Sequence, residues 1–423
     1  MSIALQGDLE FMLAPSDALP AVSRLDTVAP FRKSWVYNNW GYSVAGAVIE
    51  KLSGKPAYQY IRETILDPLG LANTTTRPVV DQDCDFAEAY SALDNATLHH
   101  LPRALPFKGS LFELAGGMFS TVNDMLKYAQ AILRAQIDAQ SSPLENLEML
   151  FQGHVPLVQS DKSFGSYGMG WIVTHLPGVV GLQGNNAELF DLDKLARIGN
   201  DTNLIKTLYH QGAGLGYYSA MYLFPESKSG FVVLTNSMPL NDAADWIARV
   251  VATALHGFQN TTDYVEFAHE SRRRKVRSVS AMKVEFDRIR EDDPGIDPRP
   301  LGVYCGRYRN VLGNFFIDIR QSLQDAHLLE LLFLGREQQM YQLRHLQGDM
   351  FEWAPDYDEQ ARRARFTRWD TAYFQVGFHF KDEHEASSLE WAGGQTLVAL
   401  HQSQSVVRDG LINSSGNSDS DEL

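Results

Sequence analysis

The sequence predicts an α/β (α+β) protein: an antiparallel sheet covered by helices, followed by a small antiparallel β-barrel-like domain. Three observations lead to this fold class. Apolar residues recur at helical spacing in the first third of the 423-residue chain, two short strands follow over 221–237, and apolar and polar side chains alternate over 301–403. Helices and strands mixed in the first part, with strands dominating the second, indicate two domains of different architecture.

The first part contains helices with clear start and stop signals. One is predicted over 43–53 and ends at Gly54, and a second runs from Pro56 to Pro68. A third, over 121–134, begins with a Thr-x-x-Asp capping box. A polar, Gly-containing turn joins the two strands of 221–237, and another helix follows them. His210, in a Gly-rich stretch, is placed at the start of this strand pair.

The composition changes after residue 262. Residues 263–300 are rich in charge and end in a Pro- and Asp-rich segment, and their basic run Arg272–Lys275 is interpreted as a solvated helix or linker. Beyond them, Phe315, Ile317 and Ile319 share one face of a predicted strand. We therefore expect a first domain over 1–262, a charged linker over 263–300, a β domain over 301–403 and a polar, disordered tail over 404–423.

Charge and cysteine content exclude several classes of protein. The formal charge of −15 and isoelectric point of about 5.2 argue against a nucleic-acid partner or an anionic membrane surface. No apolar run is long enough to span a membrane, and the first residues lack a signal-peptide pattern. The chain as given is thus expected to be cytoplasmic, with a secretory route left open if its N-terminus is incomplete. The two cysteines, Cys84 and Cys305, have no metal-binding spacing.

Two short motifs carry the functional prediction. Tyr37-Asn38-Asn39 precedes the first helix, and His210-Gln211-Gly212, followed by Ala213, precedes the strand pair. Taken in this order, with the Gly-Gly-x-x-Ser-Thr helix start between them, they resemble the serine β-lactamase and penicillin-binding-protein superfamily, in particular its class C β-lactamase-, esterase- and D-aminopeptidase-like branch. The resemblance covers roughly residues 30–260. The C-terminal β domain resembles the lipocalin-like domain of many such proteins.

The resemblance implies a serine hydrolase or acyltransferase that attacks an ester or amide and forms an acyl-enzyme, without cofactor or metal. Tyr37 would be the general base, and Asn39 would orient the substrate amide. His210 would supply a positive or hydrogen-bonding edge, Gly212 would let substrate approach the strand, and the N–H of Ala213 would be an oxyanion donor. The substrate would be a small molecule, with secondary metabolism a plausible setting. The oligomeric state stays open.

The nucleophile that the resemblance requires is missing. Members carry it in a Ser-x-x-Lys motif upstream of the Tyr motif, and residues 1–36 contain none. The chain's sole match, Ser280–Lys283, follows His210 and has the wrong order. Three explanations remain open: an N-terminally truncated product, a pseudoenzyme that binds a ligand or partner, or a different nucleophile. Whether the chain is an active enzyme is therefore uncertain. A metal-dependent hydrolase is disfavoured, because His99-His100 is the closest His pair.

Overall fold

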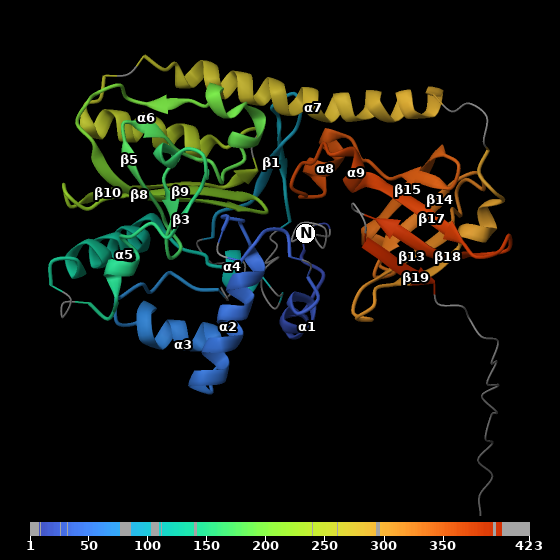
Figure 1. Ribbon diagram of the computed structural model, residues 1–423, viewed down its shortest axis with the longest axis horizontal. Helices are drawn as coiled ribbons and strands as arrows, with labels where there is room; N and C mark the ends of the chain where they lie inside the picture. The colour runs from blue at the N-terminus through green and yellow to red at the C-terminus, as the bar shows by residue number, and fades with distance from the viewer. Residues whose placement is uncertain are drawn as a thin grey trace, which may run out of the picture.

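The computed structural model describes residues 8–399, apart from residues 9, 26, 32, 77–85, 103–109, 111, 139–141, 239, 260, 293–296 and 392–394. The predicted tail over 404–423 lies outside the described residues. The chain forms two bodies, a mixed α/β domain and a β-barrel, with the helix α7 lying across both (Figure 1). Helices combined with antiparallel sheets, and a C-terminal barrel, confirm the predicted fold class.

A six-stranded antiparallel sheet forms the centre of the first domain. Its order is β10-β9-β8-β5-β4-β3, and helices α5 and α6 cover its opposite faces. Side chains alternate along β9: Tyr222 packs on the α6 side, whereas Met221 and Leu223 pack on the α5 side. Its elements are β3 (Val155–Pro156), β4 (Ser166–Tyr167), β5 (Ile172–Leu176), β8 (Ile205–Gly214), β9 (Tyr217–Phe224), β10 (Ser229–Thr235), α5 (Val122–Ala135) and α6 (Ala243–His256).

The N-terminal helices form a layer below this sheet (Figure 1). The helix predicted over 43–53 is confirmed as α2 and begins four residues earlier, because the Asn38 side chain accepts a hydrogen bond from Trp40 N at 3.0 Å and caps it. Gly54 ends α2 with a positive φ of 69°. The remaining elements of the first domain are the helices α1 (Ala18–Val22), α2 (Asn39–Ser53), α3 (Ala57–Ile61) and α4 (Glu113–Gly116), and the strands β1 (Tyr90–Ala92), β2 (Leu98–His100), β6 (Gly178–Val179), β7 (Arg197–Ile198) and β11 (Ser237–Met238) of two small sheets.

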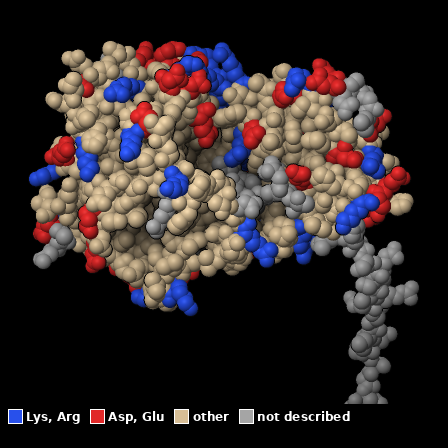
Figure 2. Space-filling view, in the orientation of Figure 1, with Lys and Arg blue, Asp and Glu red and all other residues tan. Residues whose placement is uncertain are grey.

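The segment predicted as a charged linker is a helix over most of its length. Helix α7 (Tyr264–Asp292) packs against α6 in the first domain and against β15 in the barrel. Charged side chains of both signs gather on the surface above it (Figure 2). Arg273, for example, pairs with Glu266 and Glu270. Its inner face is buried, and this stripe consists of Tyr264, Ser271, Lys275, Val279, Met282 and Phe286.

The second domain is a closed barrel whose interior is filled by aromatic side chains. Trp353 and Trp391 are buried at its centre and contact Phe333. Phe315, Ile317 and Ile319 face inward, as their alternation predicts. The strands are β12 (Gly306–Arg309), β13 (Phe316–Gln321), β14 (Leu329–Phe333), β15 (Met340–Gln347), β16 (Met350–Glu352), β17 (Gln375–Phe380), β18 (Ala386–Trp391) and β19 (Gln395–Ala399), with α8 (Tyr357–Arg362) and α9 (Thr371–Phe374) between β16 and β17.

The placement of His210 at the start of a strand pair is wrong. His210 lies in the middle of β8, and β8 pairs with β9 along its length, so the glycine-rich stretch is itself strand. Because glycine is depleted in strands, a glycine-rich stretch is easily predicted as a loop from the sequence.

Among the helices in the described part of the chain, none is both long and apolar enough to cross a membrane.

Candidate functional site

A cavity of about 450 Å³ lies between the first domain, α7 and the barrel. This volume is typical of small-molecule sites. The surface is hollowed where the two bodies meet (Figure 2). The lining residues include Phe11, Tyr37, Asn39, Phe112, Gln183, Gly184, Asn185, Glu188, Leu189, Gln211, Gly212, Ala213, Tyr218, Asn241, Asp242, Lys275 and the barrel segment Phe366–Asp370. The cavity thus joins motif residues to parts of the chain that no motif marks.

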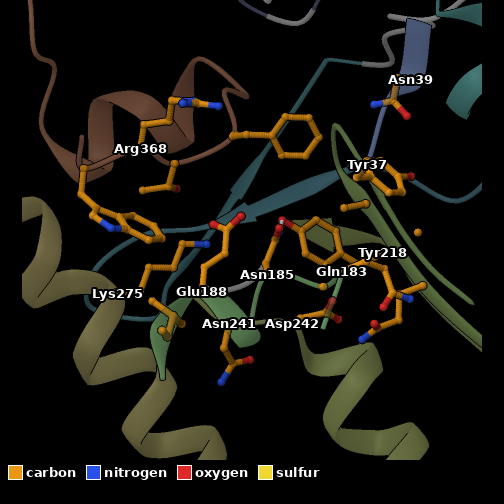
Figure 3. A pocket seen from close by; sticks show the side chains of 18 of the residues that line it. Tyr37, Asn39, Gln183, Asn185, Glu188, Tyr218, Asn241, Asp242, Lys275 and Arg368 are labelled. Carbon is orange, nitrogen blue, oxygen red and sulfur yellow. Dashed lines mark hydrogen bonds between the residues drawn. The ribbon is translucent and has the colours of Figure 1, made fainter. Parts of the chain in front are cut away.

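Tyr37 and Asn39 lie on the same side of the cavity (Figure 3). The capping bond of Asn38 starts α2 there, and Trp40 anchors the first turn by packing edge-on against Phe112 with ring centroids 5.5 Å apart. Tyr37 itself is 45% exposed. A buried Trp beside a half-exposed Tyr fixes the backbone and leaves the phenol accessible.

The surroundings of Tyr37 keep its phenol protonated. The pKa of Tyr37 is raised, first by desolvation and then by repulsion from Tyr42. Neither cause is a cation. A tyrosine acts as a base at neutral pH only where positive charge lowers its pKa. The described surroundings of Tyr37 therefore hold the phenol at the cavity without lowering its pKa.

His210 lies beside Tyr37, with ring centroids 6.4 Å apart, but does not line the cavity. Its Nδ1 lies 2.6 Å from the Gln211 carbonyl oxygen, so Nδ1–H donates and Nε2 is left to accept, with the Tyr167 hydroxyl 3.5 Å away. Burial lowers the pKa of His210. A neutral imidazole at this point offers hydrogen bonding to its neighbours and no positive charge.

The predicted oxyanion residues lie on an open strand edge. β5 pairs with β8 only as far as Tyr209, so residues 210–214 have β9 on one side and no described strand on the other. Gly212 and Ala213 line the cavity from this stretch. Backbone N–H groups on such an edge are available to a ligand. A Cβ at Gly212 would lie 2.4 Å from the Ser219 hydroxyl across the pair, so a side chain here would have to displace that hydroxyl.

The profile of the Beta-lactamase family matches residues 4–255, more than half of the chain. The chain belongs to the β-lactamase family. Tyr37, Asn39, Gly212 and Ala213 all lie within the matched residues 4–255 and line the cavity. Their catalytic roles stay predictions.

Curated relatives match part of the chain. A putative penicillin-binding protein, PbpX, of Bacillus subtilis (strain 168) is 25% identical over 43% of this chain and 42% of its own. The D-alanyl-D-alanine-carboxypeptidase/endopeptidase AmpH of Escherichia coli (strain K12) is 26% identical over 48% of this chain and 45% of its own. The matches thus span less than half the length of these relatives. Among solved structures, an octameric penicillin-binding protein homologue from Pyrococcus abyssi aligns with 91% of this chain and 70% of its own, at 21% identity and a TM-score of 0.44.

Side-chain amides line the middle of this family member's cavity. The amide atoms of Gln183 and Gln211 are buried and have no hydrogen-bond partner within the described structure. Gln211 is only 7% exposed, and its amide lies against Gly184, where a Cβ would come within 2.7 Å of Nε2. Asn185 Nδ2 donates to the Tyr218 hydroxyl at 2.6 Å. Buried unpaired amides are costly unless a ligand or water satisfies them, so these two are available to hydrogen-bond a polar group that enters the cavity.

The opposite end of the cavity is charged. Lys275 and Glu188 lie near each other there, and Arg368 lines the same side from the barrel segment, away from Tyr37 and Asn39 (Figure 3). Burial lowers the pKa of Lys275 to about 8, although Asp242 and Glu188 oppose this shift. Glu188 is open to the cavity, and desolvation raises its pKa against the charges of Arg368 and Lys275.

Asp242 links this end to a buried network. Its carboxylate caps α6 by accepting from Asp245 N at 3.0 Å, and desolvation together with the charge of Asp245 raises its pKa to about 7. The Asn186 side-chain amide donates from Nδ2 to the Asp242 carbonyl oxygen and to Asp245 Oδ2 at 2.9 Å, and its Oδ1 accepts a hydrogen bond from Asp242 N. Arg249 Nε then pairs with Asp245 at 3.1 Å. Residues 183–188, which form the floor of the cavity, are therefore held in place by the buried network of Asp242, Asp245 and Arg249.

Sequence reasoning missed the whole charged end. The sequence predicts Lys275 as part of a solvated basic run, whereas it lies on the buried stripe of α7 with Ser271 and Val279 at four-residue spacing. This four-residue spacing already indicates, from the sequence alone, that Lys275 lies on the buried face of the helix. Nothing local marks Arg368, because its position depends on how the barrel docks.

Two further predictions concern side chains outside the cavity. Ser280 and Lys283 are exposed on α7, and Ser280 Oγ donates to the Val276 carbonyl at 3.1 Å within the helix. The sole Ser-x-x-Lys of the chain thus does not line the cavity. Across the described residues, no group of three or more His, Cys, Asp or Glu is arranged to hold a metal ion.

Proposed function

We propose that this chain is a β-lactamase-related serine hydrolase or acyltransferase by lineage, whose cavity binds a small-molecule ester or amide for reaction through an acyl-enzyme. The observation that carries the proposal is that Tyr37, Asn39 and the Gly212–Ala213 edge, distant in sequence, line one cavity of ligand size. The names of the relatives, carboxypeptidase and endopeptidase, denote amide cleavage and support the same bond type. Secondary metabolism is one setting for such a substrate.

The geometry supports recognition of a carbonyl group. The open edge of β8 offers N–H donors to a carbonyl oxygen, where negative charge develops during acyl transfer. Asn39 and the unpaired amides of Gln183 and Gln211 offer both donors and acceptors to the rest of an ester or amide. None of these groups is a nucleophile, so their contribution is to bind and polarise.

A second candidate, a catalytically inactive binding module, is favoured by one specific observation. Among the described lining residues none is Ser or Cys, and the pKa of Tyr37 is raised rather than lowered. A cavity that positions a carbonyl without an activated nucleophile would retain the ligand and release it unchanged.

The two candidates are separated by covalent labelling of the 423-residue chain with a fluorophosphonate and a fluorescent penicillin, followed by intact mass. An adduct that disappears in Tyr37→Phe supports the acyl-enzyme proposal, and peptide mapping then names the nucleophile. Tyr60→Phe is the matched control, because Tyr60 is an exposed tyrosine on α3 outside the cavity. No adduct from a chain with a cooperative melt supports the binding module.

A further inference from the structure

The barrel contributes a rigid segment to the cavity. Residues 366–370 form part of its wall, and one amide fixes the backbone at their centre. Gln360 accepts from Arg368 N at 2.8 Å and donates to the Arg368 carbonyl at 3.1 Å, and Gln360 itself is buried on α8. The barrel domain thus takes part in the site through a residue whose backbone is held from both sides.

The Arg368 side chain has a donor available for a ligand. Its guanidinium lies 4.6 Å from the centre of the Tyr373 ring, and its Nε is buried without a hydrogen-bond partner among the described residues. A stacked guanidinium keeps its orientation, and an unsatisfied charged donor favours an anionic acceptor. Arg368 is therefore preorganised.

Lys275 approaches the same end from a different element. It is 6% exposed on the inner face of α7, and Glu188 and Asp242 are the acids close enough to affect its charge. The charges of Arg368 and Lys275 both act to lower the pKa of Glu188, against the larger effect of desolvation. Two cations from two elements thus line the same cavity as one carboxylate, and the charge of each acts on it.

We propose that Arg368 and Lys275 form the recognition end of the cavity and bind a free carboxylate on the substrate, whose ester or amide bond faces the family motifs at the other end. The inference rests on the proposed function in taking this cavity as the substrate site. It assigns the barrel and α7 a part in selecting substrates that are anionic at neutral pH.

A carboxylate suits this end better than an ammonium group. A ligand carboxylate would accept from Arg368 Nε, and the charges of Lys275 and Arg368 would offset its repulsion by Glu188. Asp242 is already engaged as the cap of α6. An ammonium group would instead be a third cation beside Lys275 and Arg368, with no added donor satisfied.

The test compares three probes that share a phenylacetamide and differ at one end: phenylacetylglycine, its carboxamide, and N-(2-aminoethyl)phenylacetamide. Dissociation constants are measured by calorimetry on the 423-residue chain at neutral pH. We expect the acid to bind at least about tenfold tighter than the carboxamide, the gain of roughly one charge-assisted hydrogen bond. The amine should bind most weakly.

Substitutions then locate the preference. Arg368→Gln and Lys275→Met should each weaken binding of the acid far more than that of the carboxamide, so that the two affinities become similar. Arg362→Gln, an exposed arginine on α8 outside the cavity, is the control and should keep the full preference. If Lys275→Met does not fold, Arg368→Gln still decides, because Arg368 is partly exposed and its backbone bonds remain.

The outcomes also separate this inference from the proposed function. A chain that labels with an acyl probe yet binds acid and carboxamide equally refutes the carboxylate end and leaves the hydrolase proposal standing. A chain that never labels yet prefers the acid, with the preference lost in Arg368→Gln, supports the carboxylate end alone. Tighter binding of the amine, or no measurable binding of any probe, overturns the inference.

Discussion

The two ends of the cavity differ in how they were built and in how they carry charge. The Tyr37 end consists of family motif residues, and its ionisable groups are neutral, since the pKa of Tyr37 is raised and that of His210 is lowered. The Lys275 end has no motif, and it concentrates charge from three parts of the chain. On the proposals made above, the motif residues position the scissile bond, whereas α7 and the barrel select the substrate.

The largest expected effect comes from removing the support beneath the charged end. Arg249→Met leaves Asp245 buried without its ionic partner and frees two carbonyls, those of Val180 and Ala196, to which Arg249 donates at 2.7 and 2.9 Å. We expect the free energy of unfolding to fall by about 3–5 kcal/mol. Urea denaturation followed by tryptophan fluorescence measures this change.

The control for Arg249→Met is Arg273→Met. Arg273 forms its ion pairs on the exposed face of α7, where such pairs contribute at most about 1 kcal/mol. Equal losses in the two variants would show that the buried network does not hold the floor of the cavity, and the contrast between its two ends would lose its structural basis.

The next effect is a pH dependence of ligand binding at the charged end. The ionisable groups that line the cavity there are Lys275, Glu188, Asp242, Arg368 and Asp370. Lys275 loses its proton as the pH rises through its pKa of about 8, and Asp242 gains negative charge through its pKa of about 7. Both changes oppose an anion, so acid binding should weaken as the pH rises.

Calorimetry from pH 6 to 9.5 tests this dependence. Phenylacetylglycine stays ionised throughout, because a carboxyl of this kind titrates near pH ~3.5, and we expect its affinity to drop by roughly tenfold, one charge-assisted contact. In Lys275→Met the decline above pH 8 should vanish. A flat wild-type profile would contradict the assignment of Lys275 to the ligand.

The sequence predicted the fold where local signals agree with tertiary packing. Gly54, Pro56 and the capping box at Thr121 mark elements whose ends are set by backbone chemistry, and alternation predicted the barrel strands. Prediction was wrong at His210, because the glycines around it suggest a loop, while pairing with β9 makes a strand. Strand pairing is non-local, so propensity did not decide it.

The candidate site was predictable only at its motif end. Tyr37 and Gly212 carry a recognisable pattern, whereas Arg368 gains its place from contact between domains that no periodicity encodes. Lys275 is intermediate: its burial follows from helical spacing on α7, but its charge made the run look solvated. Charged side chains at buried positions of an amphipathic helix therefore merit a functional reading.

A smaller effect concerns the titration of Tyr37. Because desolvation and Tyr42 raise its pKa, the difference in tyrosinate absorbance between the wild type and Tyr37→Phe should be absent below about pH 10, the ordinary value. Tyr60→Phe serves as the exposed comparison. A Tyr37 signal near neutral pH would mean that a cation reaches the phenol, and the motif end would then be charged like its counterpart.

The smallest expected effect is at Ser280. Its hydroxyl bonds only to the Val276 carbonyl among described groups, and it is exposed on the outer face of α7, on the side away from the buried Lys275 stripe. Ser280→Ala should change the free energy of unfolding by less than about 0.5 kcal/mol and leave labelling by acyl probes unaltered. Loss of an adduct in Ser280→Ala, with Ser278→Ala on the same helix unaffected, would make Ser280 the nucleophile. The reaction would then lie outside the cavity, and the contrast between its two ends would no longer describe catalysis.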